Sequence, residues 1–126
     1  MALVNAIQPA ALANRLTELW SPRVIAELDD YYVKVAKLHG EFGWHAHADE
    51  DELFQVLEGQ LRLRFRDGEV VLNPGELYVV AKGREHNPLA EQPCTVMLVE
   101  RKSTAHTGDV QNDITRSLAD QLRPID

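Results

Sequence analysis

Short apolar runs separated by turn residues occupy most of the chain between residues 24 and 99. Turn formers such as Asn73-Pro74-Gly75 lie between the runs, at the close spacing typical of a β-sandwich or a small barrel. No segment with helical periodicity interrupts them, which excludes an architecture of alternating strands and helices. We therefore predict an all-β fold. The expected strands cover residues 24–28, 31–38, 53–57, 61–65, 70–72, 77–80 and 95–99.

One of these runs shows a strict two-residue alternation of apolar and basic side chains. Residues i and i+2 of a strand point to the same face, so this run presents its apolar side chains to a core and its arginines outward. We expect the arginine row to be a solvated or subunit-facing surface rather than an anion site. The inward residues are Leu61, Leu63 and Phe65, and the outward residues are Arg62, Arg64 and Arg66.

The two ends of the chain follow a different pattern. After Pro9, apolar residues recur at helical spacing, which predicts a short helix that Pro22 stops. Its apolar stripe consists of Leu12, Leu16, Leu19 and Trp20. Beyond Arg101 the chain is polar before apolar residues return and predict a short terminal helix or strap. These residues are Ile114, Leu118 and Leu122.

The composition indicates one globular domain over residues 1–126 with an acidic balance. The chain has 20 acidic and 13 basic side chains, and its formal net charge of -7 argues against partners with anionic surfaces. The single cysteine, Cys94, excludes an internal disulfide and multi-cysteine zinc sites. The opening stretch lacks the basic residues of a secretory signal, and no run is long enough to span a bilayer. We expect a cytoplasmic protein with no nucleic-acid and no membrane partner.

Candidate chemistry is concentrated in one group of residues, which comprises His45-Ala46-His47, then Glu52, then His86 far downstream. If the histidine pair lies on a strand, both imidazoles project from one face roughly 6.5–7 Å apart and can converge on one ion. An isolated HxH pair is weak evidence by itself. The sequence patterns of serine hydrolases, P-loop proteins and dinucleotide-binding folds are missing, so none of these chemistries is supported.

The spacing around these residues resembles the two motifs of the cupin superfamily, G-x5-HxH-x3,4-E-x6-G and G-x5-PxG-x2-H-x3-N. The first motif is matched by His45, His47, Glu52 and Gly59, and the second by Gly75, Gly83 and His86. Three positions depart from the motifs: Gly40 lies one residue too close to His45, Ala81 replaces the proline, and Ala90 replaces the asparagine. These departures concern local loop geometry and not the ligand positions. The resemblance covers about residues 24–100 and is typical of a small bacterial member.

The resemblance implies a double-stranded β-helix, or jelly-roll barrel, that holds a metal ion inside its mouth. The implied ligands are His45, His47, Glu52 and His86. Three imidazoles and one carboxylate leave coordination positions open, and this set suits one divalent transition metal, whether Fe, Mn, Ni, Co or Zn. The nearby Asp49, Glu50 and Asp51 are alternatives for the carboxylate. Glu52 is preferred because six residues separate it from Gly59, as the motif requires.

Other residues are assigned to the pocket wall or to no role at the site. Counting in steps of two along the strands places Phe54, Val56, Tyr78 and Met97 in the pocket wall. His39 ends a strand and His106 lies in the polar tail, so neither is assigned as a ligand. No catalytic residue outside the metal ligands stands out, and no cofactor other than the metal is expected.

Two classes of function fit this interpretation. The first is a metal-dependent enzyme acting on a small molecule, either dioxygenase-like or isomerase-like, such as the mannose-6-phosphate isomerase type. Phosphosugar isomerisation would need lysines or arginines at the barrel mouth, and the outward arginine row argues against it. The alternative is a non-enzymatic, metal-containing module that binds or senses a small ligand. Because small cupins are commonly homodimers, the resemblance also implies a homodimer.

Overall fold

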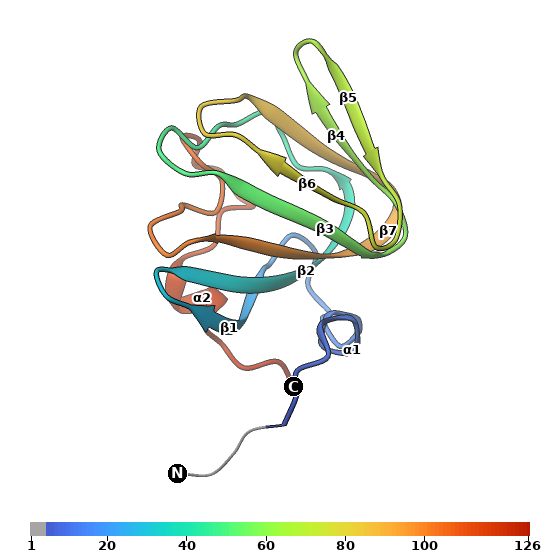
Figure 1. Cartoon of the computed structure of the whole chain (residues 1–126), viewed down its shortest axis with the longest axis vertical. Helices are drawn as coiled ribbons and strands as arrows, with labels where there is room; N and C mark the ends of the chain where they lie inside the picture. The colour runs from blue at the N-terminus through green and yellow to red at the C-terminus, as the bar shows by residue number, and fades with distance from the viewer. Residues whose placement is uncertain (1–4) are drawn as a thin grey trace.

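Antiparallel strands form most of the regular structure in this computed structural model, which describes residues 5–126. The predicted all-β fold is confirmed, and the helices in this part of the chain are short (Figure 1). The strands are β1 (Arg23–Leu28), β2 (Tyr31–Glu41), β3 (Glu52–Glu58), β4 (Leu61–Phe65), β5 (Gly68–Leu72), β6 (Leu77–Val80) and β7 (His86–Arg101). The helices are α1 (Pro9–Asn14) and α2 (Leu118–Gln121).

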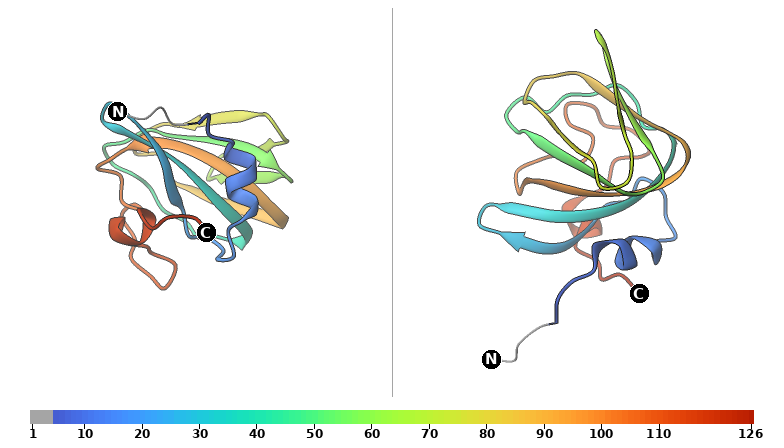
Figure 2. Two further views of the ribbon diagram at one scale, coloured as in Figure 1. Left: turned by 90° about the horizontal axis from the view of Figure 1, so that it is seen from below. Right: turned by 45° about the vertical axis from the view of Figure 1, so that its right-hand side comes forward.

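Strand β7 is the spine of the fold, because it pairs with three other strands along its length. Its first part pairs with β4, and its second part lies between β2 and β3. The sheet order is β1-β2-β7-β3-β6, and the β4–β5 hairpin attaches to β7 beside this path. The views in Figures 1 and 2 show that the strands curl into a cup.

Strand β7 is longer than the apolar run predicts. The expected strand covers residues 95–99, whereas β7 has 16 residues. Pro88 and Pro93 obscure the pattern, since proline cannot donate a backbone hydrogen bond to a ladder. Pairing with β4, where Pro88 lies opposite Leu63, nevertheless extends the strand. The extension makes His86 the first residue of a strand instead of part of a loop.

The core fills the inside of the cup. The inward residues predicted in β4 are buried and its arginines face outward, so the alternation is confirmed. The arginine row is paired with acidic side chains: Arg62 with Glu69 and Glu91, Arg64 with Glu41, and Arg66 with Glu85. It is therefore a charge-paired outer surface. The core residues are Ala36, Leu38, Phe54, Val56, Leu61, Leu63, Phe65, Leu72, Val80, Ala90, Cys94, Val96 and Leu98.

Helix α1 is shorter than the apolar stripe predicts, because it ends at Asn14. Trp20 has a left-handed backbone conformation with φ of 54°, and its backbone N–H donates to the Lys37 carbonyl at 2.9 Å. The chain therefore turns onto β2 before it reaches Pro22 and does not continue as a helix. Leu19, which is 42% exposed, shows that only part of the stripe is packed.

The C-terminal segment ends in the short helix that the sequence predicts, α2. The Ser117 hydroxyl accepts a hydrogen bond from the Asp120 N–H at 3.1 Å and caps this helix. Its buried residue is the polar Gln121, while Leu118 and Leu122 are largely exposed. Figure 1 places α1 and α2 near β1 and β2, away from the β4–β5 hairpin. Within residues 5–126 no helix is long and apolar enough to cross a membrane.

Candidate metal centre

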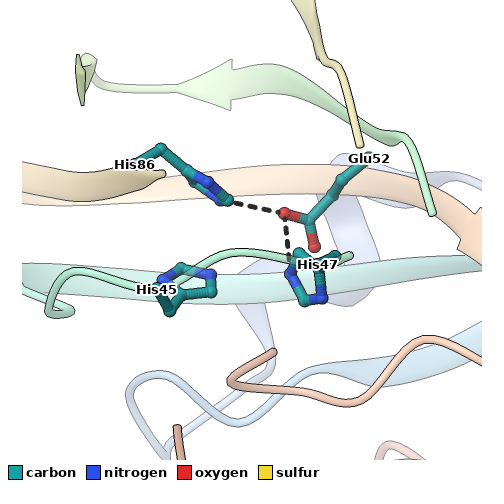
Figure 3. Close-up of side chains that lie close together, drawn as sticks. All are labelled: His45, His47, Glu52 and His86. Atoms are coloured by element: carbon teal, nitrogen blue, oxygen red, sulfur yellow. Dashed lines mark ion pairs between the residues drawn. The ribbon is translucent and has the colours of Figure 1, made fainter. Parts of the chain in front are cut away.

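Four side chains from separate parts of the fold converge inside the cup. His45 and His47 lie in the loop between β2 and β3. Glu52 begins β3, and His86 begins β7. All four are buried, and one possible ligand atom from each lies within 4.8 Å of the others. Figure 3 shows the Glu52 carboxylate between the imidazoles of His47 and His86, with His45 beside them.

The HxH segment is an extended loop and not a regular strand, which corrects the expectation from the sequence. His45 and His86 pair through two backbone hydrogen bonds of 3.0 and 2.9 Å. The Asp109 N–H donates to the Ala46 carbonyl at 3.0 Å, and the Ala46 N–H donates to the Asp109 carboxylate at 3.0 Å. These contacts hold the loop extended, so His45 and His47 reach the same group although no strand carries them.

Backbone carbonyls set the orientation of two imidazole rings. The Nδ1 of His45 lies 3.1 Å from the Gly43 carbonyl, and the Nδ1 of His86 lies 3.0 Å from the Arg84 carbonyl. In both pairs the imidazole nitrogen has to donate, because a carbonyl only accepts. The neutral ring then keeps a free lone pair on Nε2, the arrangement usual for histidines that ligate metals.

The facing atoms of this group lack hydrogen-bond partners among the described residues. The orphaned atoms are Nε2 of His47, Nε2 of His86 and Oε1 of Glu52. The Glu52 oxygen lies 3.5 Å from the His47 nitrogen and 3.4 Å from the His86 nitrogen, at the long end for hydrogen bonds. Buried polar atoms without partners are costly, and an ion between three imidazoles and a carboxylate would satisfy them. The residues therefore fit a divalent transition metal.

Burial and the neighbouring side chains shift the pKa values of three of these groups. Burial lowers the pKa of His45 to about 4, and the proximity of the His86 imidazole adds to this effect. Burial alone would raise the pKa of Glu52, but the neighbouring imidazoles of His47 and His86 keep it well below its usual value. Burial likewise opposes charge on His47, yet Glu52 raises its pKa. A proton on His47 would therefore compete with a metal ion.

The structure distinguishes the carboxylates that the sequence left as alternatives. Asp51 is exposed and accepts a hydrogen bond from the Lys82 N–H at 2.8 Å. Glu50 accepts one from the Ser103 hydroxyl at 3.3 Å, and Asp49 is exposed. Glu52 is the carboxylate that reaches the histidines.

A pocket adjoins the four-residue group, and His45 and Glu52 line it. Phe54 is in the wall as predicted, whereas the prediction is wrong for the other three residues. Val56 is fully buried in the core, Tyr78 packs against Phe65, and Met97 lies opposite Gln55 outside the pocket. The lining residues are Trp20, Pro22, Ala36, Leu38, Phe42, His45, Glu52, Phe54, Pro88, Val96, Leu98, Glu100 and His106.

Sequence reasoning missed two ionisable residues of this wall, Glu100 and His106. Glu100 lies two residues beyond Leu98 on β7, so the two-residue alternation could have placed it on the inner face. No such signal exists for His106, which lies in an irregular segment after β7. Its position depends on contacts with residues distant in sequence.

Glu100 belongs to a buried polar network beneath the pocket. The Lys34 ammonium donates to Glu100 at 2.7 Å and to the Gln121 side chain at 2.6 Å. Burial raises the pKa of Glu100 well above its usual value, and the neighbouring Glu52 raises it further, while Lys34 acts in the opposite direction. The network links the wall of the pocket to α2.

The strands form a cup, and three histidines and a carboxylate inside it could hold a metal ion. The sequence model described as "Cupin domain" matches residues 31–100, which is more than half of the chain, and the chain belongs to the cupin family. It is 38% identical over 93 residues to the uncharacterized protein YdbB of Bacillus subtilis, an alignment that covers 73% of this chain and 82% of that protein.

Solved structures share this fold. A cupin-2 domain containing protein from Shewanella frigidimarina is 47% identical with a TM-score of 0.74, over 76% of this chain and 94% of the other. Protein NMB1881 from Neisseria meningitidis is 29% identical with a TM-score of 0.70, over 78% of this chain and 100% of the other. The expected membership of the cupin superfamily is thus confirmed.

Proposed function

We propose that this cupin is a metal-dependent enzyme that acts on a small molecule. The observation that carries the proposal is the set of buried, unpartnered ligand atoms beside an apolar pocket. In this proposal one divalent transition metal, whether Fe, Mn, Ni, Co or Zn, is held by His45, His47, Glu52 and His86. When bound, such an ion supplies a Lewis acid or an O2-binding centre.

The pocket gives the protein a means of bringing a substrate to that group. Two of the candidate ligands, His45 and Glu52, also form part of the pocket wall. A molecule in the pocket would therefore lie against them, while apolar side chains such as Phe42 and Phe54 exclude water. In this proposal the side chains of the pocket wall bind the substrate and orient it toward the candidate ligands.

The wall of the pocket favours dioxygenase-like over phosphosugar isomerase-like chemistry. Among the described residues, the pocket lining includes no lysine and no arginine, which are the usual partners of a phosphate. Glu100 would instead repel a phosphate if it were ionised. The arginines of the outer row are engaged by glutamates, as in the pair of Arg62 with Glu69 at 2.8 Å. We therefore favour a substrate without a phosphate group.

A metal-containing module that binds or senses a small ligand is the second candidate. The same pocket supports it, since binding needs the wall but no turnover. The two candidates differ in one observable: an enzyme converts a compound from a small-molecule extract into a product, while a sensor shows only a ligand-dependent rise in melting temperature.

The test of the metal-dependent enzyme begins with elemental analysis of protein purified without a histidine tag. The expected result is about one equivalent of a transition metal, lost in the His47→Ala variant and retained in His39→Ala. His39 is a suitable control because it is exposed on β2. Iron-loaded protein would next be screened for oxygen consumption. Failure to bind any of the five metals after reconstitution would contradict the proposal.

We also propose that the protein forms a homodimer through the outer face of the sheet. One apolar row crosses four neighbouring strands, with each residue directly opposite the next. It consists of Val33 on β2, Val99 on β7, Leu53 on β3 and Val79 on β6. Val79 remains 48% exposed, and a second copy would present the same apolar row to cover it. Light scattering should give twice the 14.2 kDa chain mass. Val79→Lys should produce a monomer, whereas Leu28→Lys at the opposite edge should not.

A further inference from the structure

His106 is an ionisable residue of the pocket wall that lies outside the group of four candidate ligands. The wall is mostly apolar, and its ionisable side chains are the candidate ligands His45 and Glu52 together with Glu100 and His106. Glu100 already accepts a hydrogen bond from Lys34 at 2.7 Å, and its second oxygen is buried without a hydrogen-bond partner among the described residues. The imidazole of His106 lines the pocket, is no part of the group of four, and is not held by a charged partner as Glu100 is.

The ring of His106 is held with its proton on one nitrogen. The backbone N–H of Arg116 donates to Nδ1 at 2.8 Å, so Nδ1 is an acceptor and the neutral ring carries its proton on Nε2. Burial lowers the pKa of His106 to about 4, and the charges of Lys34 and Arg116 add to this effect, so the ring is neutral at pH 7. Nε2–H is then a hydrogen-bond donor with no acceptor among the described residues.

The contacts around Arg116 keep this donor in place. The Arg116 carbonyl accepts a hydrogen bond from the Gln121 side chain at 3.1 Å, and Gln121 in turn accepts from Lys34 at 2.6 Å. Phe42 packs against His106 with ring centres 5.4 Å apart, and against His45 at 4.9 Å. The imidazole is therefore preorganised on the same aromatic side chain that supports a candidate ligand.

We propose that His106 determines ligand specificity, by donating a hydrogen bond from Nε2–H to an uncharged acceptor oxygen on a small, otherwise apolar or aromatic compound. The inference rests on the proposed function, because it assigns the substrate class of the same site. A carbonyl or ether oxygen fits, since a neutral donor in an apolar wall matches a neutral acceptor. His106 lies outside residues 31–100, so the cupin match itself carries no information about this preference.

The test uses zinc-reconstituted protein and two probes of nearly equal shape, acetophenone and α-methylstyrene, which differ in having a C=O or a C=CH2 group. Wild-type protein should bind acetophenone about fivefold more tightly, as one hydrogen bond allows. His106→Phe should abolish this preference, so that the two probes bind about equally, without weakening α-methylstyrene binding. His39→Phe is the matched control and should keep the preference.

A second measurement does not depend on the folding of the variant. The ¹⁵N resonance of His106 Nε2 in the wild-type protein should shift on addition of acetophenone and stay in place with α-methylstyrene. Any of four results would overturn the inference. These are equal binding of the two probes, an unchanged preference in His106→Phe, an unmoved resonance, and no binding of either probe. Loss of zinc binding would instead overturn the proposed metal centre, because the probe preference is measured separately from metal content.

Discussion

The barrel strands and the C-terminal segment both reach the pocket, but they contribute different things to it. All four residues of the candidate metal centre lie within residues 31–100, the part of the chain that matches the cupin domain. His106 lies beyond that match and lines the wall of the pocket. The two proposals therefore assign metal binding and ligand selection to different parts of the chain, and substitutions should alter them separately.

The two regions also differ in how they are held in place. The barrel is stabilised by an apolar core, in which loss of one contact leaves many others. The C-terminal segment depends on individual polar contacts, such as those of Asp109 with Ala46 and of Gln121 with Lys34. Single substitutions at these contacts should therefore have large and specific effects.

The strongest test of the comparison is metal content. Replacing His47 with alanine or Glu52 with glutamine should lower bound metal more than about tenfold, because a ligand is lost from the group. His106→Phe should leave it unchanged, since His106 lies outside the group of four. Elemental analysis of the three variants measures this. A similar metal loss in all three would contradict the separation of the two regions.

The next largest effect is expected where the two regions are joined by the buried lysine. Lys34→Met should destabilise the fold by about 3–5 kcal/mol, because Glu100 and Gln121 lose their common buried partner. Urea unfolding measures this change. Lys102→Met is the control, since its ion pair with Glu27 is exposed and should be worth less than about 1 kcal/mol. Equal effects of the two substitutions would show that burial of Lys34 does not matter.

A third effect is expected where the C-terminal segment packs against the HxH loop. Gly108 has φ of 63°, and an added Cβ would lie 2.1 Å from the Ala46 carbonyl oxygen. Gly108→Ala should therefore cost about 2–3 kcal/mol and weaken metal binding, since Ala46 lies between two candidate ligands. Gly75→Ala, with φ of 87° and open space around it, should cost only about 1 kcal/mol and keep the metal. Thermal melts and metal titrations distinguish the two.

The smallest predicted effect concerns the pH dependence of metal-free protein. The pKa of His106 is about 4 in the folded protein, below its ordinary value of 6.5, so the unfolded chain binds more protons between these two values. The stability contributed by neutral His106 is present above pH 6.5 and is lost as the pH falls toward 4. Between pH 7 and 4.5, the wild type should lose about 2 kcal/mol relative to His106→Phe in denaturant unfolding. A pH-independent difference would contradict this assignment.

Several features of the fold and the site were accessible from local pattern. The alternation of Leu61, Leu63 and Phe65 with arginines was sufficient to orient β4, because strand periodicity depends on the backbone alone. The resemblance to the cupin motifs implied the four residues that the structure brings together. Pro88 and Pro93, by contrast, concealed most of β7, whose pairing depends on a partner strand distant in sequence.

The sequence by itself determined the all-β fold, because strand periodicity is a property of the local chain, and its resemblance to the cupin motifs implied the residues of the candidate metal centre. Tertiary structure alone decided the end of α1, the extended shape of the HxH loop and the position of His106 in the pocket. Each of these depends on hydrogen bonds between residues far apart in the chain, such as that of Asp109 with Ala46. Such contacts form only when the strands have curled around the core, so the local sequence pattern does not predict them.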